Sequence, residues 1–272
     1  MLDILKAIFL GIVEGITEWL PISSTGHLII ADEFVKLNLS ANFMEMFNVV
    51  IQLGAIMAVV VIYFKQLWPF SLKKEEHFIK KDVFSMWFKV LVAILPAAII
   101  GIPFDDFFNE KFHNYIVVSL ALIIYGVAFI LIEKRNKNLT VKTESIADMS
   151  FKTALFIGCF QALSLIPGTS RSGSTVLGAI LLGVSRVAAA EFSFYMAVPV
   201  MAGASLIKLL KFGFDFTSQE LVILFVGMLT AFLVSILAIK FLIGYIKKRD
   251  FTAFGYYRIV LGIIVLLYFG LK

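Results

Sequence analysis

Six long apolar runs constrain the fold of this chain more than any other feature of its sequence. They cover residues 46–64, 86–104, 115–132, 187–207, 220–245 and 254–271. A helix rises about 1.5 Å per residue and the hydrocarbon core of a bilayer is about 30 Å thick, so each run is long enough to cross a membrane. The sequence therefore predicts an all-α integral membrane protein with six transmembrane helices.

The composition excludes a soluble protein. Of the 272 residues, 60% are hydrophobic and 16% are charged, whereas soluble domains are about half apolar and about a quarter charged. Because so little polar surface is available, we expect the lipid bilayer to be the solvent, and we expect no nucleic-acid partner despite the formal net charge of +5. The single cysteine, Cys159, lies in an apolar run, and we expect it to be buried.

The positions of Lys and Arg predict the orientation in the membrane. Thirteen of them lie in three segments, 65–85, 133–152 and 246–253. Only five, Lys6, Lys36, Lys111, Lys208 and Lys211, lie in the alternate segments. Since cytoplasmic loops carry an excess of Lys and Arg, we expect the three basic segments to face the cytoplasm.

Two further apolar segments are interrupted by polar turns. Residues 2–20 precede a turn that begins at Pro21, and residues 153–166 precede a turn that begins at Pro167. The apolar pieces after the turns have only about 11 residues each, which is too short to cross the bilayer. We therefore predict re-entrant helical hairpins over 2–37 and 153–183.

The order of these segments predicts two related halves. Repeat one, about 1–135, and repeat two, about 150–272, each contain one interrupted hairpin followed by three spans. A few residues pair between the halves at a constant separation: Pro21 with Pro167, Ser23 with Thr169, Ser24 with Ser170, and Glu45 with Glu191. Because three crossings separate the halves, they enter the membrane from opposite faces, which predicts an inverted-topology repeat within a single membrane domain.

Irregular backbone at membrane depth is tolerated where it is buried in protein or lines a wet cavity. We therefore expect the two turns to meet inside the protein. The half-helices that begin near Ser24 and Ser170 have hydroxyl N-caps, and their N-termini would direct free N–H groups to one place. Two such helix ends predict an anion site.

Two acidic residues in the first apolar segment need a partner. Glu14 and Glu18 are four residues apart and therefore lie on one helical face. An ionisable residue in an apolar helix costs about 3 kcal/mol, so two like charges indicate a bound cation or a shared proton. A surface-lying amphipathic helix with both acids in water is the alternative interpretation.

Polar residues in the two turns complete a candidate site. Arg171 has a planar guanidinium that suits phosphate, and hydroxyl groups flank it. His27 follows the first turn, and we expect a catalytic or phosphate-binding role for it, in contrast to the loop residues His77 and His113. Acids, hydroxyls, His and Arg together fit phosphoryl hydrolysis, and they also fit a transporter or lipid flippase for a phosphorylated substrate.

Two motifs resemble the signatures of a known family. They read Glu14-Gly-Ile-Thr-Glu18-Trp-Leu-Pro-Ile-Ser-Ser-Thr-Gly-His27 and Pro167-Gly-Thr-Ser-Arg171-Ser-Gly173. They are similar to those of the bacterial undecaprenyl-diphosphate phosphatases of the bacitracin-resistance type, and the resemblance covers the whole chain. It implies a multi-pass plasma-membrane hydrolase that converts undecaprenyl diphosphate to undecaprenyl phosphate, which recycles the lipid carrier for cell-wall and peptidoglycan synthesis and confers bacitracin resistance.

The resemblance also implies roles for individual residues. Glu14 and Glu18 would bind a divalent cation, Mg²⁺ or Ca²⁺, or activate water. Ser24 and His27 would be the nucleophile or the general acid and base, and Arg171 would bind the diphosphate. Further phosphate contacts would come from Ser23, Thr25, Thr169, Ser170 and Ser172. The nucleophile stays open among Ser24, His27 and a water held by Glu18.

The family resemblance further implies a polyprenyl diphosphate lipid as substrate and an active site that faces outward. The sequence leaves a homo-oligomer open.

Overall fold

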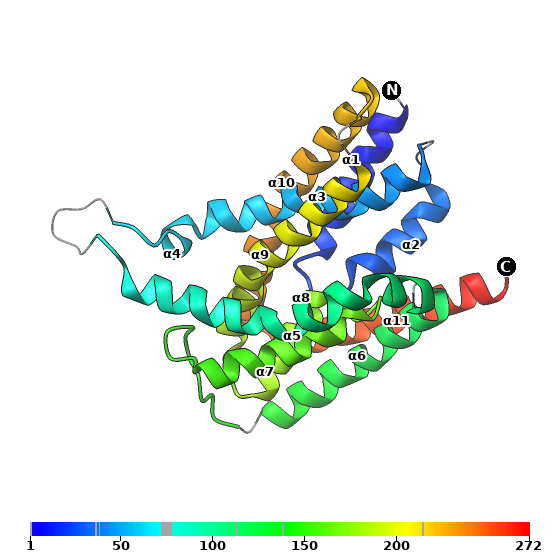
Figure 1. Ribbon diagram of the computed structural model, residues 1–272. Coiled ribbons are helices and arrows are strands. Elements are labelled where there is room, and N and C mark those ends of the chain that lie inside the picture. Colours follow the sequence, from blue (N-terminus) through cyan, green and yellow to red (C-terminus); the bar gives the residue numbers. More distant parts are fainter. Residues whose placement is uncertain are drawn as a thin grey trace.

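The structure is a computed structural model that describes residues 2–35, 37, 39–71, 78–112, 114–137, 139–213 and 215–272, without the side chains of Asp32, Asp105 and Asn109 (Figure 1). His77 and His113 lie outside the described residues. Within these ranges the chain is helical, and the only β-type pairings are two isolated bridges, Phe70 with Ile79 and Thr143 with Val184.

In the part of the chain that the structure describes, six helices are long and apolar enough to cross a membrane, which confirms the predicted number of spans. They are α3 (Ala41–Ile62), α5 (Lys81–Phe112), α6 (Tyr115–Asn136), α9 (Arg186–Phe212), α10 (Ser218–Ile246) and α11 (Thr252–Gly270). The apolar part of α5 ends at Phe104, whose backbone is non-helical and follows Pro103. The proline ring removes a helical hydrogen bond and accounts for the break.

Shorter helices cover the two interrupted segments. The first contains α1 (Leu2–Thr17) and α2 (Ser24–Phe34), and the second contains α7 (Phe151–Ala162), the 3₁₀ turn η1 (Leu163–Leu165) and α8 (Arg171–Leu181). A single helical turn, α4 (Phe64–Leu67), follows α3. The breaks between α1 and α2 and between η1 and α8 therefore coincide with the two polar turns.

Helices α6 and α11 lie side by side and antiparallel (Figure 1). Their backbones touch at Gly126 and Gly255, where a Cβ atom added to either residue would lie 2.7 Å from the carbonyl oxygen of the other. Phe129 meets Phe251 further along the same contact. Only glycine permits this approach, because any side chain would push the two helices apart.

Each interrupted segment packs along a long helix of the other half. Helix α1 runs parallel to α10, since Gly11 lies against the Gly227 carbonyl and Gly15 lies against the Ala231 carbonyl. Helix α7 runs parallel to α5, and Gly158 lies against the Ala93 carbonyl. The two halves of the chain are therefore interleaved.

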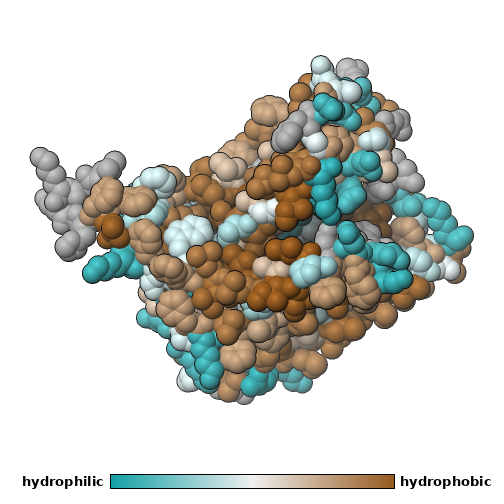
Figure 2. All heavy atoms as spheres, viewed as in Figure 1, coloured by the Kyte–Doolittle hydropathy of each residue, from teal (hydrophilic) through white to brown (hydrophobic). Residues whose placement is uncertain are grey.

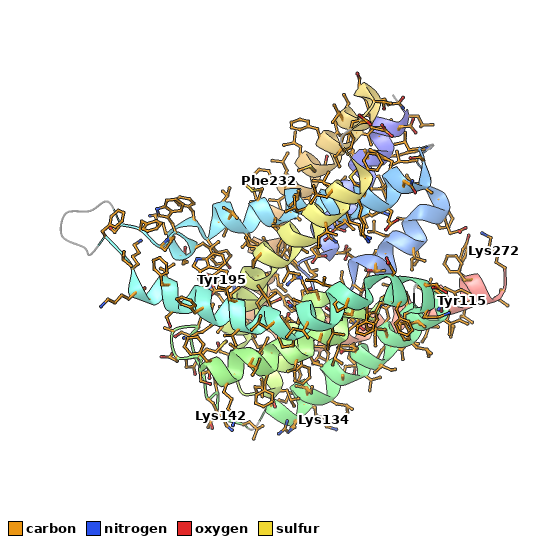
Figure 3. The ribbon with its side chains drawn as sticks, viewed as in Figure 1. Tyr115, Lys134, Lys142, Tyr195, Phe232 and Lys272 are labelled. Atoms are coloured by element: carbon orange, nitrogen blue, oxygen red, sulfur yellow. The ribbon has the colours of Figure 1, made fainter. Side chains whose placement is uncertain are left out.

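The surface is mostly hydrophobic on the face shown in Figure 2, and its hydrophilic side chains lie mainly along the lower edge and the right-hand side. In Figure 3, Lys134 and Lys142 lie at one end of the molecule, whereas Tyr115 and Lys272 lie at the other. Cys159 is exposed on α7, so the prediction that it is buried was wrong. Leu155 and Phe156 of the same helix are also exposed, whereas Ala154 and Ile157 are buried, so only one face of the apolar run packs inside the protein.

Candidate active site

The first turn places Ser23 and Ser24 in different roles. Ser23 caps α2 with a φ of 73°, and its side chain accepts a hydrogen bond from the Gly26 N–H. The sequence predicted a half-helix that begins near Ser24 and has a hydroxyl N-cap. In the structure Ser24 is the first helical residue of α2, and Ser23 is the N-cap. The Ser24 hydroxyl is therefore free to bind elsewhere.

The second turn has the same backbone shape. Ser170 caps α8 with a φ of 72°, and its side chain accepts from the Gly173 N–H. Among the described non-glycine residues, only Ser23 and Ser170 have a positive φ. The two capping serines are therefore Ser23 and Ser170, whereas the sequence paired Ser24 with Ser170.

Glu18 is the point where the two turns meet. The Ser24 hydroxyl donates to Oε2 of Glu18 over 3.0 Å, and Nη2 of Arg171 donates to Oε1 over 3.2 Å. The Glu18 and Arg171 side chains are both largely buried. Ser24 and Arg171 thus share one carboxylate, and Glu18 and Arg171 are 153 positions apart in the chain.

Further contacts hold the second turn against Glu18. The Ser172 hydroxyl donates to the Glu18 carbonyl over 2.9 Å, and Nη1 of Arg171 donates to the Ser193 carbonyl on α9 over 2.9 Å. The Ser193 hydroxyl accepts from Thr175 over 2.7 Å. Nε of Arg171 is buried and has no hydrogen-bond partner among the described residues, so the guanidinium retains a donor for an anion.

Glu14 is fully buried beside this network. No group in the described part of the chain donates a hydrogen bond to either of its carboxylate oxygens. The Glu18 N–H donates to the Glu14 carbonyl, which continues the helical pattern and keeps the two acids on one face. A buried carboxylate in this setting needs a cation or a proton shared with Glu18.

His27 bonds at both ring nitrogens. Nδ1 lies 2.7 Å from the Ser23 carbonyl oxygen, and Nε2 lies 2.6 Å from the hydroxyl of Tyr257 on α11. His27 therefore lies in the same turn of α2 as Ser24, but it bonds to Ser23 and Tyr257, whereas Ser24 bonds to Glu18.

The remaining predicted residues flank this centre. Thr25 is half-buried in the first turn of α2, and Thr169 is buried before α8. Glu45 and Glu191 lie apart from it, because Glu45 pairs with Lys208 and Glu191 interacts with Tyr63.

Arg258 on α11 is a site residue that the sequence reasoning missed. It is fully buried, and it donates to the Pro21 carbonyl of the first turn and to the Gly168 and Thr169 carbonyls of the second. Its guanidinium also lies over the Tyr125 ring, 5.5 Å from the centroid. A charged residue within the predicted span 254–271 was the available signal, because such residues rarely lack a function.

Most of the chain matches the model of a known protein family. The model of the family described as bacitracin resistance protein BacA matches residues 7–264. This chain belongs to the BacA family. Six apolar spanning helices and this membership make it a multi-pass protein of the cell membrane.

Curated relatives carry the name undecaprenyl-diphosphatase. The BacA-family protein is 64% identical to one from Acetivibrio thermocellus, over 99% of this chain and 98% of the relative. It is 64% identical to one from Enterococcus faecalis, over 98% and 97%, and 58% identical to one from Desulfitobacterium hafniense, over 100% and 98%. These relatives favour hydrolysis over the transporter alternative.

Proposed function

We propose that this BacA-family protein is an undecaprenyl-diphosphatase, a membrane hydrolase that converts undecaprenyl diphosphate to undecaprenyl phosphate and inorganic phosphate. Through this reaction it returns the lipid carrier to cell-wall synthesis and confers resistance to bacitracin. The observation that carries the proposal is the Glu18 carboxylate, which binds both the Ser24 hydroxyl and the Arg171 guanidinium.

The contact between Ser24 and Glu18 supports a serine nucleophile. A serine hydroxyl attacks phosphorus well only when a neighbouring base takes its proton, and Oε2 of Glu18 already accepts that hydrogen bond. In this mechanism the Ser24 oxygen attacks the terminal phosphorus, Glu18 receives the proton, and undecaprenyl phosphate leaves. Water then releases the phosphate from Ser24.

Arg171 and the two helix N-termini would stabilise the transferred phosphate. The unpartnered Nε of Arg171 supplies a donor, and the free N–H groups at the starts of α2 and α8 supply partial positive charge. Ser23, Thr25, Thr169, Ser170 and Ser172 surround these helix ends. Charge stabilisation of this kind provides most of the catalysis in phosphoryl transfer.

The chemistry of Glu14 and Glu18 fits a divalent cation, Mg²⁺ or Ca²⁺. Both ions prefer oxygen ligands, and the two buried Glu14 oxygens have no other partner among the described groups. In the described part of the chain no third acid, His or Cys joins them, so oxygens of substrate or water would complete the ligand set. When bound, the cation would withdraw charge from phosphate oxygens.

His27 is the second candidate for proton transfer or nucleophilic attack. It lies one helical turn from Ser24, but its bonds go to Ser23 and Tyr257 and not to the Glu18–Ser24 pair. Trapping a phosphoenzyme on Ser24 would establish the serine route. Inversion of configuration at phosphorus in the released phosphate, with no phosphoenzyme detected, would instead favour direct attack by water held by Glu18, because the serine route has two displacements and retains the configuration.

The contacts between helices support two inverted repeats with re-entrant hairpins, about 1–135 and about 150–272. A pseudo-two-fold axis relating the two halves would superimpose α1 on α7 and α10 on α5. The parallel pairs α1 with α10 and α7 with α5 have that relation. The antiparallel pair α6 with α11 would lie on the axis, where Gly126 and Gly255 make mutual contacts.

The ends of the half-helices support approach from opposite faces. Near the end of α2, Glu33 bonds to Lys272, whereas Gly183, just after α8, accepts from the N–H groups of Lys142 and Thr143 in a basic loop. These two places lie at opposite ends of the molecule (Figure 3). Because the basic loops would face the cytoplasm, α2 would open the site outward.

Phosphate release tests the proposed function. Purified protein in detergent is expected to release phosphate from undecaprenyl diphosphate, and a chelator is expected to abolish the release until Mg²⁺ or Ca²⁺ is restored. A folded, monodisperse preparation that releases no phosphate with either ion would refute the proposal. Activity unchanged by chelation would refute the cation site alone.

A further inference from the structure

The contacts of His27 identify one tautomer of its ring. A carbonyl oxygen only accepts hydrogen bonds, so the 2.7 Å contact with the Ser23 carbonyl requires a proton on Nδ1. In the neutral ring Nε2 then carries no proton, and it accepts the hydroxyl proton of Tyr257 over 2.6 Å. The two ring planes are nearly parallel, 8° apart.

Tyr257 reaches His27 from the other half of the chain. It lies on α11, next to Arg258, which binds the carbonyl groups of both turns. Two consecutive side chains of α11 therefore contact the site. Tyr257 is 46% exposed, and its hydroxyl bonds to Nε2 of His27.

We propose that Tyr257 is a positioning residue for His27, holding the ring in one plane and in the tautomer whose basic nitrogen is Nε2. A hydroxyl both donates and accepts. Tyr257 can therefore donate to Nε2 while His27 is neutral and accept from the Nε2–H group after His27 has gained a proton. The ring is held in both states, which suits a histidine that exchanges protons during turnover.

The second turn contains a counterpart that lacks the histidine. In the register set by the two capping serines, His27 corresponds to Ser174, and the hydroxyl of Tyr125 on α6 lies 3.4 Å from the Ser174 hydroxyl. In each half of the chain, a tyrosine on the last long helix thus contacts the half-helix of the opposite half. In this register the two contacted residues are equivalent. One pair contains a titratable ring, whereas the other contains only two hydroxyls, and Tyr125 is therefore the matched control.

The role of Tyr257 rests on the proposed function, and two measurements separate them. The first is phosphate release by Tyr257→Phe and Tyr125→Phe, each checked for monodispersity and melting temperature. We expect Tyr257→Phe to lower kcat about tenfold with KM changed less than about twofold, because a mispositioned proton-transfer group affects the reaction more than binding. Tyr125→Phe should stay within about twofold of the unsubstituted protein.

The second measurement is ¹⁵N NMR of histidine-labelled protein with His77→Gln and His113→Gln, which leaves His27 as the single histidine. We expect neutral His27 to carry its proton on Nδ1, and Tyr257→Phe to produce a mixture of tautomers. This readout needs no activity, and the spectrum before substitution of Tyr257 already tests the geometry.

Three results would overturn the proposal: a proton on Nε2 of neutral His27, kcat unchanged in Tyr257→Phe, or an equal loss in Tyr125→Phe. If the unsubstituted protein released no phosphate, the proposed function would fail, while the spectrum would still decide the contact between Tyr257 and His27.

Discussion

The turn from Pro21 to Gly26 and the turn from Pro167 to Gly173 have the same backbone shape and contribute opposite charges. Each is capped by a serine at positive φ that accepts from a glycine N–H three residues later. The first turn follows the acids Glu14 and Glu18, and the second leads into Arg171. Two turns of the same backbone shape thus supply two helix ends, and their side chains supply complementary parts of one candidate site.

The largest expected effect comes from the carboxylate that both turns share. Glu18→Gln keeps the shape of the side chain but removes the base for Ser24 and the charge that pairs with Arg171. We expect phosphate release to fall about a thousandfold. The control is Glu45→Gln, which removes an acid whose partner is Lys208 and should leave the rate within about twofold.

A Glu18→Gln protein that kept a tenth of the original rate would show that the first turn contributes binding and not catalysis. The two turns would then not supply complementary parts of one catalytic site, although the description of the fold would be unaffected.

The next effect concerns the residue that holds the turns together. Arg258→Leu removes the donor to three buried carbonyl groups, one in the first turn and two in the second. We expect a loss of about 3 kcal/mol of stability, since buried acceptors would lose their partners. Thermal unfolding in detergent would measure it as a lower melting temperature. An unchanged melting temperature would mean that the turns stay together without Arg258.

The smallest effect compares the two caps. Ser23→Ala and Ser170→Ala each remove a capping hydroxyl and leave a Cβ at positive φ, whereas Ser23→Gly and Ser170→Gly remove the hydroxyl but suit that φ. We expect each glycine variant to be about 1 kcal/mol more stable than its alanine counterpart, measured by chemical denaturation. Equal stability at one turn would show that the two backbones are not equivalent in strain.

Much of the fold could be predicted because lipid imposes simple rules. Six spans follow from apolar length alone, and each of the two breaks follows from a proline and polar residues in an otherwise apolar segment. The exact register of the turns could not be predicted. Ser23 and Ser24 are chemically identical, and only the backbone geometry decides which of them caps α2.

The acids, the hydroxyls and Arg171 could be predicted as site candidates because their types are rare in apolar segments. Arg258 is likewise a charged residue in an apolar segment, the predicted span 254–271. Tyr257 and Ser193 gave no such signal, since tyrosine and serine are common in such helices. Their contacts with His27 and Arg171 depend on how distant helices pack together.

The central claim is that residues of both turns act as one catalytic unit, and a double-mutant cycle on Glu18 and Arg171 tests it most directly. Glu18→Asp and Arg171→Lys each keep the charge but lose the geometry of the contact, and we expect each to lower kcat/KM about thirtyfold. If the two side chains act together, the double variant should be about as active as either single variant. Losses that multiply to about a thousandfold in the double variant would contradict the claim, because the two turns would then act independently.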